Sequence, residues 1–233
     1  MRRAIASAVG AFFFLSAYPA GALTGQEIAE KAYNALRGQE DGYTDYTVNF
    51  TQVTTDKDGE EMGRAKCKMY FKKPDKFHVD ILEYYERGEK KDPPERDKDE
   101  EGKLDLKLPL DKDHFRDYRF TYKATEEVSG KKCYRLAFSS AKEAEGYIYG
   151  SLWVSAGDYN VVKGIGQLYV QPEHCSESSM TMHFSDYGGR TMVRKVSMYA
   201  KATFLLFINK DIYITTTYTG YKFNQGIPES KFE

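Results

Sequence analysis

Histidine, cysteine and glycine are the residues that could carry catalytic or metal chemistry in this chain, but their spacing builds no such site. The four histidines are scattered through the 233 residues, and the pair His174-Cys175 has no second ligand pair at a zinc-like spacing. The stretch Gly164-Ile165-Gly166 lacks the third glycine and the following helix of a phosphate-binding loop. The sequence has no nucleophile elbow. It therefore predicts no enzyme, no metal site and no cofactor, which leaves binding as the chemistry to explain.

Apolar residues at every second position between residues 43 and 81 form the clearest pattern. Two such runs flank the turn Asp56–Gly59, and Pro74 marks a corner before a third run. Strands of this kind have one apolar face and one solvent-exposed face, which is typical of an antiparallel sheet. The apolar face must be covered or occupied, so its residues are candidate ligand contacts. From these strands and later ones the candidates are Val48, Phe50, Met69, Phe71, Phe77, Val79, Leu136, Phe138, Leu152 and Val154.

One helix is predicted before the first strand. Thr24 and Glu27 have the spacing of a capping box, and an apolar stripe beginning at Ile28 ends at Gly38. The stripe would pack against the sheet, either as ordinary core or as a lid over a hollow. Ile28 and Leu36 from this stripe complete the set of candidate contacts.

A lipid-binding hollow makes few demands on residue identity. Each buried methylene contributes about 0.8 kcal/mol, so one acyl chain brings on the order of 10 kcal/mol before the costs of binding. A filled core without a cavity fits the same candidate residues, because any packed sheet shows the same alternation. The residues alone leave both interpretations open.

Strand-like runs separated by turns continue to residue 222 and predict a mainly β fold of roughly ten strands. Residues 86–107 interrupt them with charges of both signs and with Pro93-Pro94, so we expect a flexible surface loop there. The run Thr203–Ile208 is continuously apolar. It is either a strand buried on both faces or an entrance lip that touches a membrane or a lipid-bearing partner.

The N-terminus reads as an export signal. Arg2 and Arg3 precede an apolar run over residues 4–17, and Ala20-Gly21-Ala22 is a signal-peptidase pattern. We expect residues 1–22 to be removed and Leu23 to begin a single periplasmic domain over residues 23–233. The apolar run is shorter than the roughly 20 residues that a spanning helix needs, and no cysteine follows the cut to carry a lipid anchor.

The amino-acid composition limits the kinds of partner that the protein could bind. Lys and Arg total 34 against 35 Asp and Glu, so the protein has no broad electrostatic field that would attract nucleic acid. About 210 residues suffice for one β domain, which we expect to be a monomer. Cys67, Cys133 and Cys175 allow at most one bridge, and their pairing stays open, although the first two stand in strand-like runs where buried free thiols are common.

The chain resembles a known family in several segments that keep the family's order. These are TGQEIAEKAYNALRG, YTVNFTQVTTDKDGEE leading to CKMYFKKPDKFHVDI, and VSGKKCYRLAF followed by GSLWVS and YNVVKGIG. Together they span most of the mature chain. They resemble the periplasmic outer-membrane lipoprotein carriers and their LolA-like relatives, which include lipid-binding lipoproteins and an envelope-stress sensor.

The resemblance implies a strongly curved antiparallel sheet, an unclosed half-barrel lidded by helices, whose hollow receives lipid or lipoprotein acyl chains without catalytic residues. In the carriers, an arginine linked to cargo hand-over precedes the proline of the strand-end motif. Here that position is Lys73 before Pro74, which keeps the charge but not the planar fork. Where the carriers have another hairpin, this chain has the charged segment after Ile81. An exported carrier of the lipoprotein-sorting type is the function that these features favour.

Two other functions fit the sequence. An envelope sensor or scaffold would share every feature above and differ only in its partner, which would include a membrane protein of the envelope. A glycan-binding module would use tyrosines as stacking platforms, and it requires Tyr147, Tyr149 and Trp153 to be exposed in a row. Burial of Trp153 would exclude the glycan module.

Overall fold

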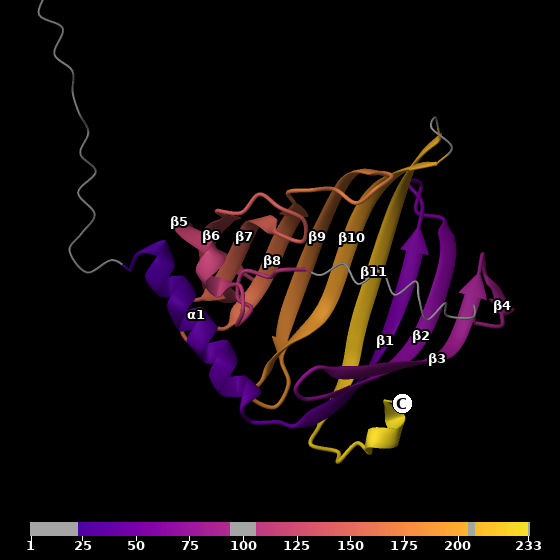
Figure 1. The fold of residues 1–233 in the computed structure, drawn as a ribbon, viewed down its shortest axis with the longest axis horizontal. Coiled ribbons are helices and arrows are strands. Elements are labelled where there is room, and N and C mark those ends of the chain that lie inside the picture. Colours follow the sequence, from indigo (N-terminus) through magenta and orange to yellow (C-terminus); the bar gives the residue numbers. More distant parts are fainter. Residues whose placement is uncertain (1–22, 94–105, 205–207, 233) are drawn as a thin grey trace, which may run out of the picture.

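The described residues fold into one antiparallel sheet of eleven strands with a single α-helix against one face (Figure 1). The computed structural model describes residues 23–93, 106–204 and 208–232. The sheet order is β4-β3-β2-β1-β11-β10-β9-β8-β7-β6-β5, so β4 and β5 are its two edges and the sheet is not closed. The strands are β1 Asp45–Thr55, β2 Glu61–Lys72, β3 Lys76–Glu86, β4 Glu89–Lys91, β5 Tyr118–Val128, β6 Lys131–Ser140, β7 Ile148–Ser155, β8 Val161–Leu168, β9 Cys175–Asp186, β10 Thr191–Phe204 and β11 Ile208–Phe223.

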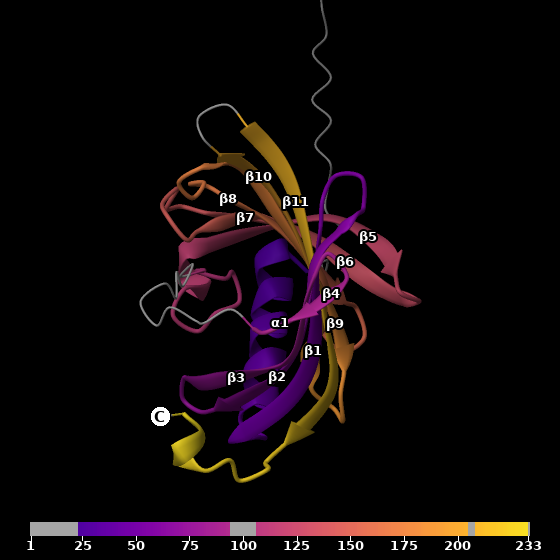
Figure 2. The same cartoon turned by 90° about the vertical axis from the view of Figure 1, so that its right-hand side faces the viewer.

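The predicted mainly β half-barrel is therefore confirmed, with one strand more than expected. Sequential strands pair as a meander from β5 to β11, and β11 then pairs with β1. This last pairing joins the N-terminal hairpins to the end of the chain. Figure 2 shows the strands curling around the helix. Two short 3-10 helices, Phe115–Asp117 and Glu229–Lys231, lie outside the sheet.

Helix α1, Gly25–Glu40, begins as the sequence predicts. The Thr24 backbone N–H donates to Glu27 at 2.7 Å, and the Glu27 N–H donates to the Thr24 hydroxyl at 3.2 Å, which completes the capping box. The helix does not stop at Gly38 but continues to Glu40, where Arg37 and Glu40 form an ion pair at 2.6 Å. Its apolar stripe packs mainly on β5, β6 and β7.

The main core lies between α1 and these strands. Ile28, Ala29 and Ala32 of α1 are almost completely buried against the apolar side chains of β5 to β8. Gly150 explains how neighbouring strands approach closely here, because a Cβ at this position would lie 1.9 Å from the Ile165 carbonyl oxygen. A second small cluster on the opposite face contains Cys133, Trp153 and Val162.

The charged segment departs from expectation at both of its described ends. Residues Glu89–Lys91 form the short edge strand β4, which pairs with β3, although we expected a loop. At the other end, Lys107 forms a parallel bridge with Tyr147, and Leu106 and Leu108 pack against the core. Edge pairing needs only backbone groups on one side, so alternation of side chains does not reveal it. Residues 94–105 lie outside the described part.

Other expectations have mixed outcomes. Cys67 and Cys133 are buried and Cys175 is half-buried, and none of these three described residues forms a disulfide, which answers the pairing that the sequence leaves open. Thr203–Ile208 spans the junction of β10 and β11, but the side chains of this run lie outside the described residues, as does the export signal over residues 1–22.

Among residues 23–93, 106–204 and 208–232, no helix is both long and apolar enough to cross a membrane.

Candidate functional site

The side of the sheet that faces α1, here called the inner face, is largely apolar along its width. Directly paired residues of antiparallel strands point to the same side, so the strand register traces this face. One row of paired residues is Leu152, Gly164, Met182, Val196, Thr216 and Gln52. The next row is Gly150, Gly166, Met180, Met198, Ile214 and Thr54.

The two halves of the inner face differ in their cover. Beneath α1, side chains such as Leu136 and Val154 are 0% exposed. From β9 to β3, beyond the strands on which α1 mainly packs, the inner side chains are mostly half-buried, and Met198 and Phe77 are 38% and 46% exposed. Apolar surface that is gathered on one face and left open to water marks an interaction site.

A cavity of about 340 Å³ lies at the boundary between the covered and the open half. The C-terminal half of α1, the loop Leu108–Asp111 and strands β7 to β10 enclose it. Such a volume is within the range of ordinary ligand pockets, which are also mostly apolar with a few polar groups. Its lining consists of Leu36, Arg37, Glu40, Leu108, Pro109, Leu110, Asp111, Leu152, Val161, Met182, Phe184, Thr191 and Val193. A cavity of about 180 Å³ adjoins it and shares Leu36, Glu40 and Phe184.

The structure separates the sequence-predicted contacts into two groups. Ile28, Leu136, Phe138, Leu152 and Val154 belong to the buried core under α1. At the far end of the inner face, a second group gathers on β1 to β3, where the strand register pairs Val48 with Met69 and Val79, and Phe71 with Phe77; Phe50 lies beside them. Leu36 is half-buried and lines the cavity between the groups.

The residues that connect these groups were not singled out from the sequence. Met180 and Met182 of β9, Val196 and Met198 of β10, and Ile214 of β11 occupy the middle of the inner face. Each belongs to a run that alternates apolar and polar residues, which is the signal that could have found them. Methionine adapts its shape to irregular apolar partners, so the paired Met180 and Met198, with Met182 beside them, suit a surface that accepts flexible chains.

An aromatic cluster closes the inner face where β1, β2 and β11 meet. Tyr46 stacks on Phe71 with ring centroids 5.0 Å apart and contacts Tyr221 at 5.7 Å. Tyr187 contacts Tyr221 at 4.7 Å. Burial raises the pKa of Tyr46 and of Tyr221 well above the usual range of a phenol. These hydroxyls therefore stay neutral, and the cluster forms an aromatic wall at this end of the inner face.

Lys73, the position that the resemblance links to cargo hand-over, holds the end of α1. Its ammonium donates to the Glu40 carbonyl oxygen and lies 4.6 Å from the centre of the Tyr43 ring. Arg190, from the turn between β9 and β10, donates to the Gly42 carbonyl oxygen at 2.8 Å. Cations beside the last carbonyls of a helix are favourable. The structure thus shows Lys73 as an anchor of the helix that borders the cavity.

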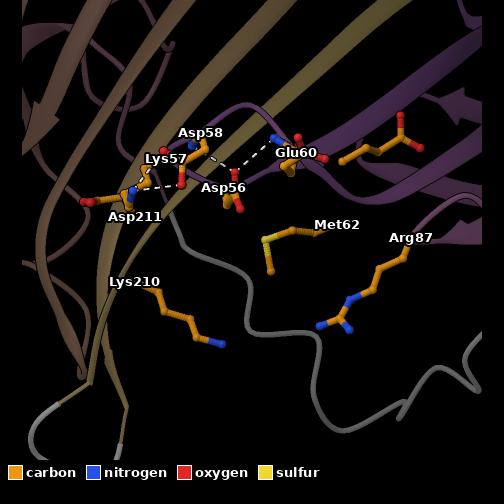
Figure 3. Close-up of a pocket in the computed structure, with 9 residues that line it drawn as sticks. Asp56, Lys57, Asp58, Glu60, Met62, Arg87, Lys210 and Asp211 are labelled. Atoms are coloured by element: carbon orange, nitrogen blue, oxygen red, sulfur yellow. Dashed lines mark hydrogen bonds and ion pairs between the residues drawn. The ribbon is translucent and has the colours of Figure 1, made fainter.

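A larger cavity, about 550 Å³, lies at the other end of the strands (Figure 3). The β1–β2 hairpin, the β3–β4 turn and the start of β11 surround it. Its walls are mainly charged, in contrast to the first cavity. The lining residues are Asp56, Lys57, Asp58, Glu60, Glu61, Met62, Arg87, Lys210 and Asp211.

Burial excludes the glycan-binding alternative. Trp153 is 7% exposed and Tyr147 is 5% exposed, so only Tyr149 of the three aromatics is accessible. The Trp153 indole donates to Glu126 at 2.9 Å and its ring lies under the Lys163 ammonium. No row of stacking platforms exists on this strand. Within the described chain, His, Cys, Asp and Glu form no group of three that could hold a metal ion.

Taken together, the fold defines an unclosed antiparallel half-barrel with one helix over half of an apolar inner face. A DUF1329 family protein from Desulfovibrio piger has a similar structure, with 12% sequence identity, a TM-score of 0.53, and coverage of 88% of this chain and 97% of that one. At this identity the likeness is one of fold.

Two further solved structures are similar at lower scores. A LolA superfamily protein from Nitrosomonas europaea has 14% identity and a TM-score of 0.43, covering 91% of this chain and 98% of that one. A Vibrio parahaemolyticus domain described as an outer membrane lipoprotein-sorting protein has 11% identity and a TM-score of 0.43, covering 88% and 97%. No family model matches the sequence, and no curated protein does.

Proposed function

We propose that this protein binds lipid or lipoprotein acyl chains on its inner face and carries them through the periplasm after removal of residues 1–22. The observation that supports this function most directly is the uneven cover of the inner face. A protein that used the face only as core would bury it completely. Here the half from β9 to β3 stays open and leads into the apolar cavity beside Leu36.

The physical basis is ordinary transfer of methylenes out of water. An acyl chain lying along Met198, Ile214 and Phe50 would remove apolar surface of both partners from water, at about 0.8 kcal/mol for each methylene. The half-buried methionines would adapt to chains of different length. No acid, base or nucleophile is required, so the function is carriage without catalysis.

The strongest test places a charge on the inner face and a matched charge on the outer face. Met198 is 38% exposed on the inner side of β10, and Tyr213 is 41% exposed on the opposite side of the neighbouring strand β11. We expect Met198→Asp to lower the amount of lipid that co-purifies without detergent by about tenfold or more, because a carboxylate against acyl chains costs several kcal/mol. Met198→Leu and Tyr213→Asp should retain wild-type amounts.

Mass spectrometry of organic extracts gives the readout, with circular dichroism to verify folding. Equal lipid in folded Met198→Asp and Tyr213→Asp proteins would contradict the proposed site. A wild-type protein that purifies without lipid would instead support a sensor or scaffold whose open half binds a segment of a partner protein. The Phe50→Asp variant extends the test to the far end of the face, where we also expect lipid to be lost and Phe50→Leu to keep it.

A further inference from the structure

The charged cavity of Figure 3 lies at the rim of the apolar inner face. Lys210 stands two residues before Ile212 on β11, and Ile212 two residues before Ile214, so all three side chains point to the inner side. Met62 contributes an apolar wall to the same cavity. A chain that lies along the inner face past Ile214 would therefore end in this cavity.

Two cations and two carboxylates of the lining face each other across Met62. Figure 3 shows the ammonium of Lys210 and the guanidinium of Arg87 extending toward each other below Met62, with Asp56 and Glu60 on the other side of it. The two cations come from β11 and from the β3–β4 turn, and the carboxylates come from the β1–β2 hairpin. Met62 thus lies between this pair of cations and this pair of carboxylates (Figure 3).

Several charges in this cavity have protein partners. Lys57 and Asp58 pair at 2.8 Å, Arg64 outside the cavity pairs with Glu61, and Asp211 accepts from the Tyr199 hydroxyl at 2.8 Å. Asp56 accepts two backbone N–H groups of its own turn through one oxygen, Oδ1. These pairs fix the shape of the walls.

The backbone at Arg87 is held in an uncommon conformation that directs its side chain. Arg87 has φ 47° and Gly88 has φ 83°, the left-handed pair of a tight hairpin turn, in which asparagine or aspartate usually precedes glycine. The Arg87 N–H donates to the Met62 carbonyl oxygen at 3.2 Å, which ties the turn to the cavity wall. The turn thus holds Arg87 at the edge of the cavity.

We infer that this cavity binds the head group of a zwitterionic phospholipid, with the phosphate beside Arg87 and Lys210 and the amine beside Asp56 and Glu60. A guanidinium suits phosphate oxygens, and an ammonium head suits carboxylates. A volume of about 550 Å³ open to water accommodates a polar head while the chains follow the inner face. This inference rests on the proposed lipid-binding function and narrows it to one ligand class.

The test uses three lipids with identical acyl chains and different heads. Diacylglycerol has no phosphate, phosphatidylglycerol has a phosphate and no amine, and phosphatidylethanolamine has both a phosphate and an amine. Vesicles containing all three in equal amounts are offered to the delipidated protein, which is recovered and extracted for mass spectrometry. We expect phosphatidylethanolamine to be taken up about three to ten times more than either other lipid, the range that one or two partly exposed ionic contacts provide.

Variants separate the pair of cations from the pair of carboxylates. Arg87→Gln should lower both phospholipids relative to diacylglycerol, and Glu60→Gln should lower phosphatidylethanolamine relative to phosphatidylglycerol. Arg119→Gln, on the exposed side of β5 far along the sheet order, is the matched control and should leave the profile unchanged. Equal uptake of all three lipids by the wild type would overturn the head-group site while leaving chain binding intact. Absence of all three lipids, diacylglycerol included, would instead overturn the proposed function.

Discussion

Gly25 shows how a single residue sets the position of α1. A Cβ at this position would lie 2.4 Å from the Tyr122 backbone nitrogen, so the first turn of the helix touches the backbone of β5. We expect Gly25→Ala to destabilise the protein by about 1–3 kcal/mol, the usual cost of overpacking. Gly38 is the matched control, because nothing lies within 4 Å of its added Cβ. Gly38→Ala should stabilise the helix by about 0.5–1 kcal/mol.

Urea unfolding of both variants measures these free energies. Similar midpoints for the Gly25→Ala protein and the wild type would show that the helix can withdraw from β5 without penalty. The sequence places both glycines in the same predicted helix, and its alternation of residues does not distinguish them. The difference comes from a tertiary contact that local patterns do not contain.

The three thiols should react at different rates. Cys67 and Cys133 are buried, and burial raises the pKa of the Cys133 thiol above its ordinary value. Cys175 is half-buried at the start of β9. We expect Cys175 to be modified rapidly by a disulfide reagent in the folded protein. Cys67 and Cys133 should be modified only after denaturation. Mass spectrometry of the labelled peptides identifies each site, and rapid labelling of Cys133 would contradict the buried core cluster.

At the scale of elements, the C-terminal segment is fastened by charge. The Glu229 carboxylate lies 2.7 Å from the Lys72 ammonium and 2.6 Å from the Lys76 ammonium. Hydrogen bonds from these two lysines lower the pKa of Glu229 from 4.5 to about 2. Because the folded pKa is lower than the unfolded one, the stabilisation is complete above pH 4.5 and is lost as the pH falls toward 2.

Glu229→Gln removes this dependence. We expect the variant to unfold at a slightly lower urea concentration than the wild type at pH 6, with the difference shrinking as the pH falls from 4.5 toward 2. Glu30→Gln, an exposed change on α1, corrects for general charge effects. A difference that stays constant with pH would show that the Glu229 ion pairs do not hold the segment.

Elements with a clear local signal were predicted from the sequence, and elements whose local signal is absent or misleading were not. The capping box fixed the start of α1, and the turn Asp56–Gly59 joins β1 to β2 as expected. The short strand β4 was missed because Glu89–Lys91 has no apolar residue to alternate. The end of α1 was placed too early because Gly38 has open space around it and the helix continues past it.

At the scale of the whole molecule, the site depends on which strands the helix covers. The predicted contacts share one face of the sheet, but the pairing of β1 with β11 places their two groups at opposite ends of it. Sequence separation gives no measure of this distance, since residues 48 and 220 lie side by side after folding. The open middle of the face, with Met180 and Met198, follows from that order of strands.

The two edges of the sheet bear on how far copies of such a fold add to one another. Free strand edges invite further strands, and an open apolar face adds to this hazard of polymerisation. Here β4 offers only three residues, all charged or exposed, and β5 carries Arg119, Lys123 and Glu127 at exposed positions. Charged and very short edges discourage a second sheet from aligning. Charge at these two borders thus opposes the polymerisation that the open apolar face favours.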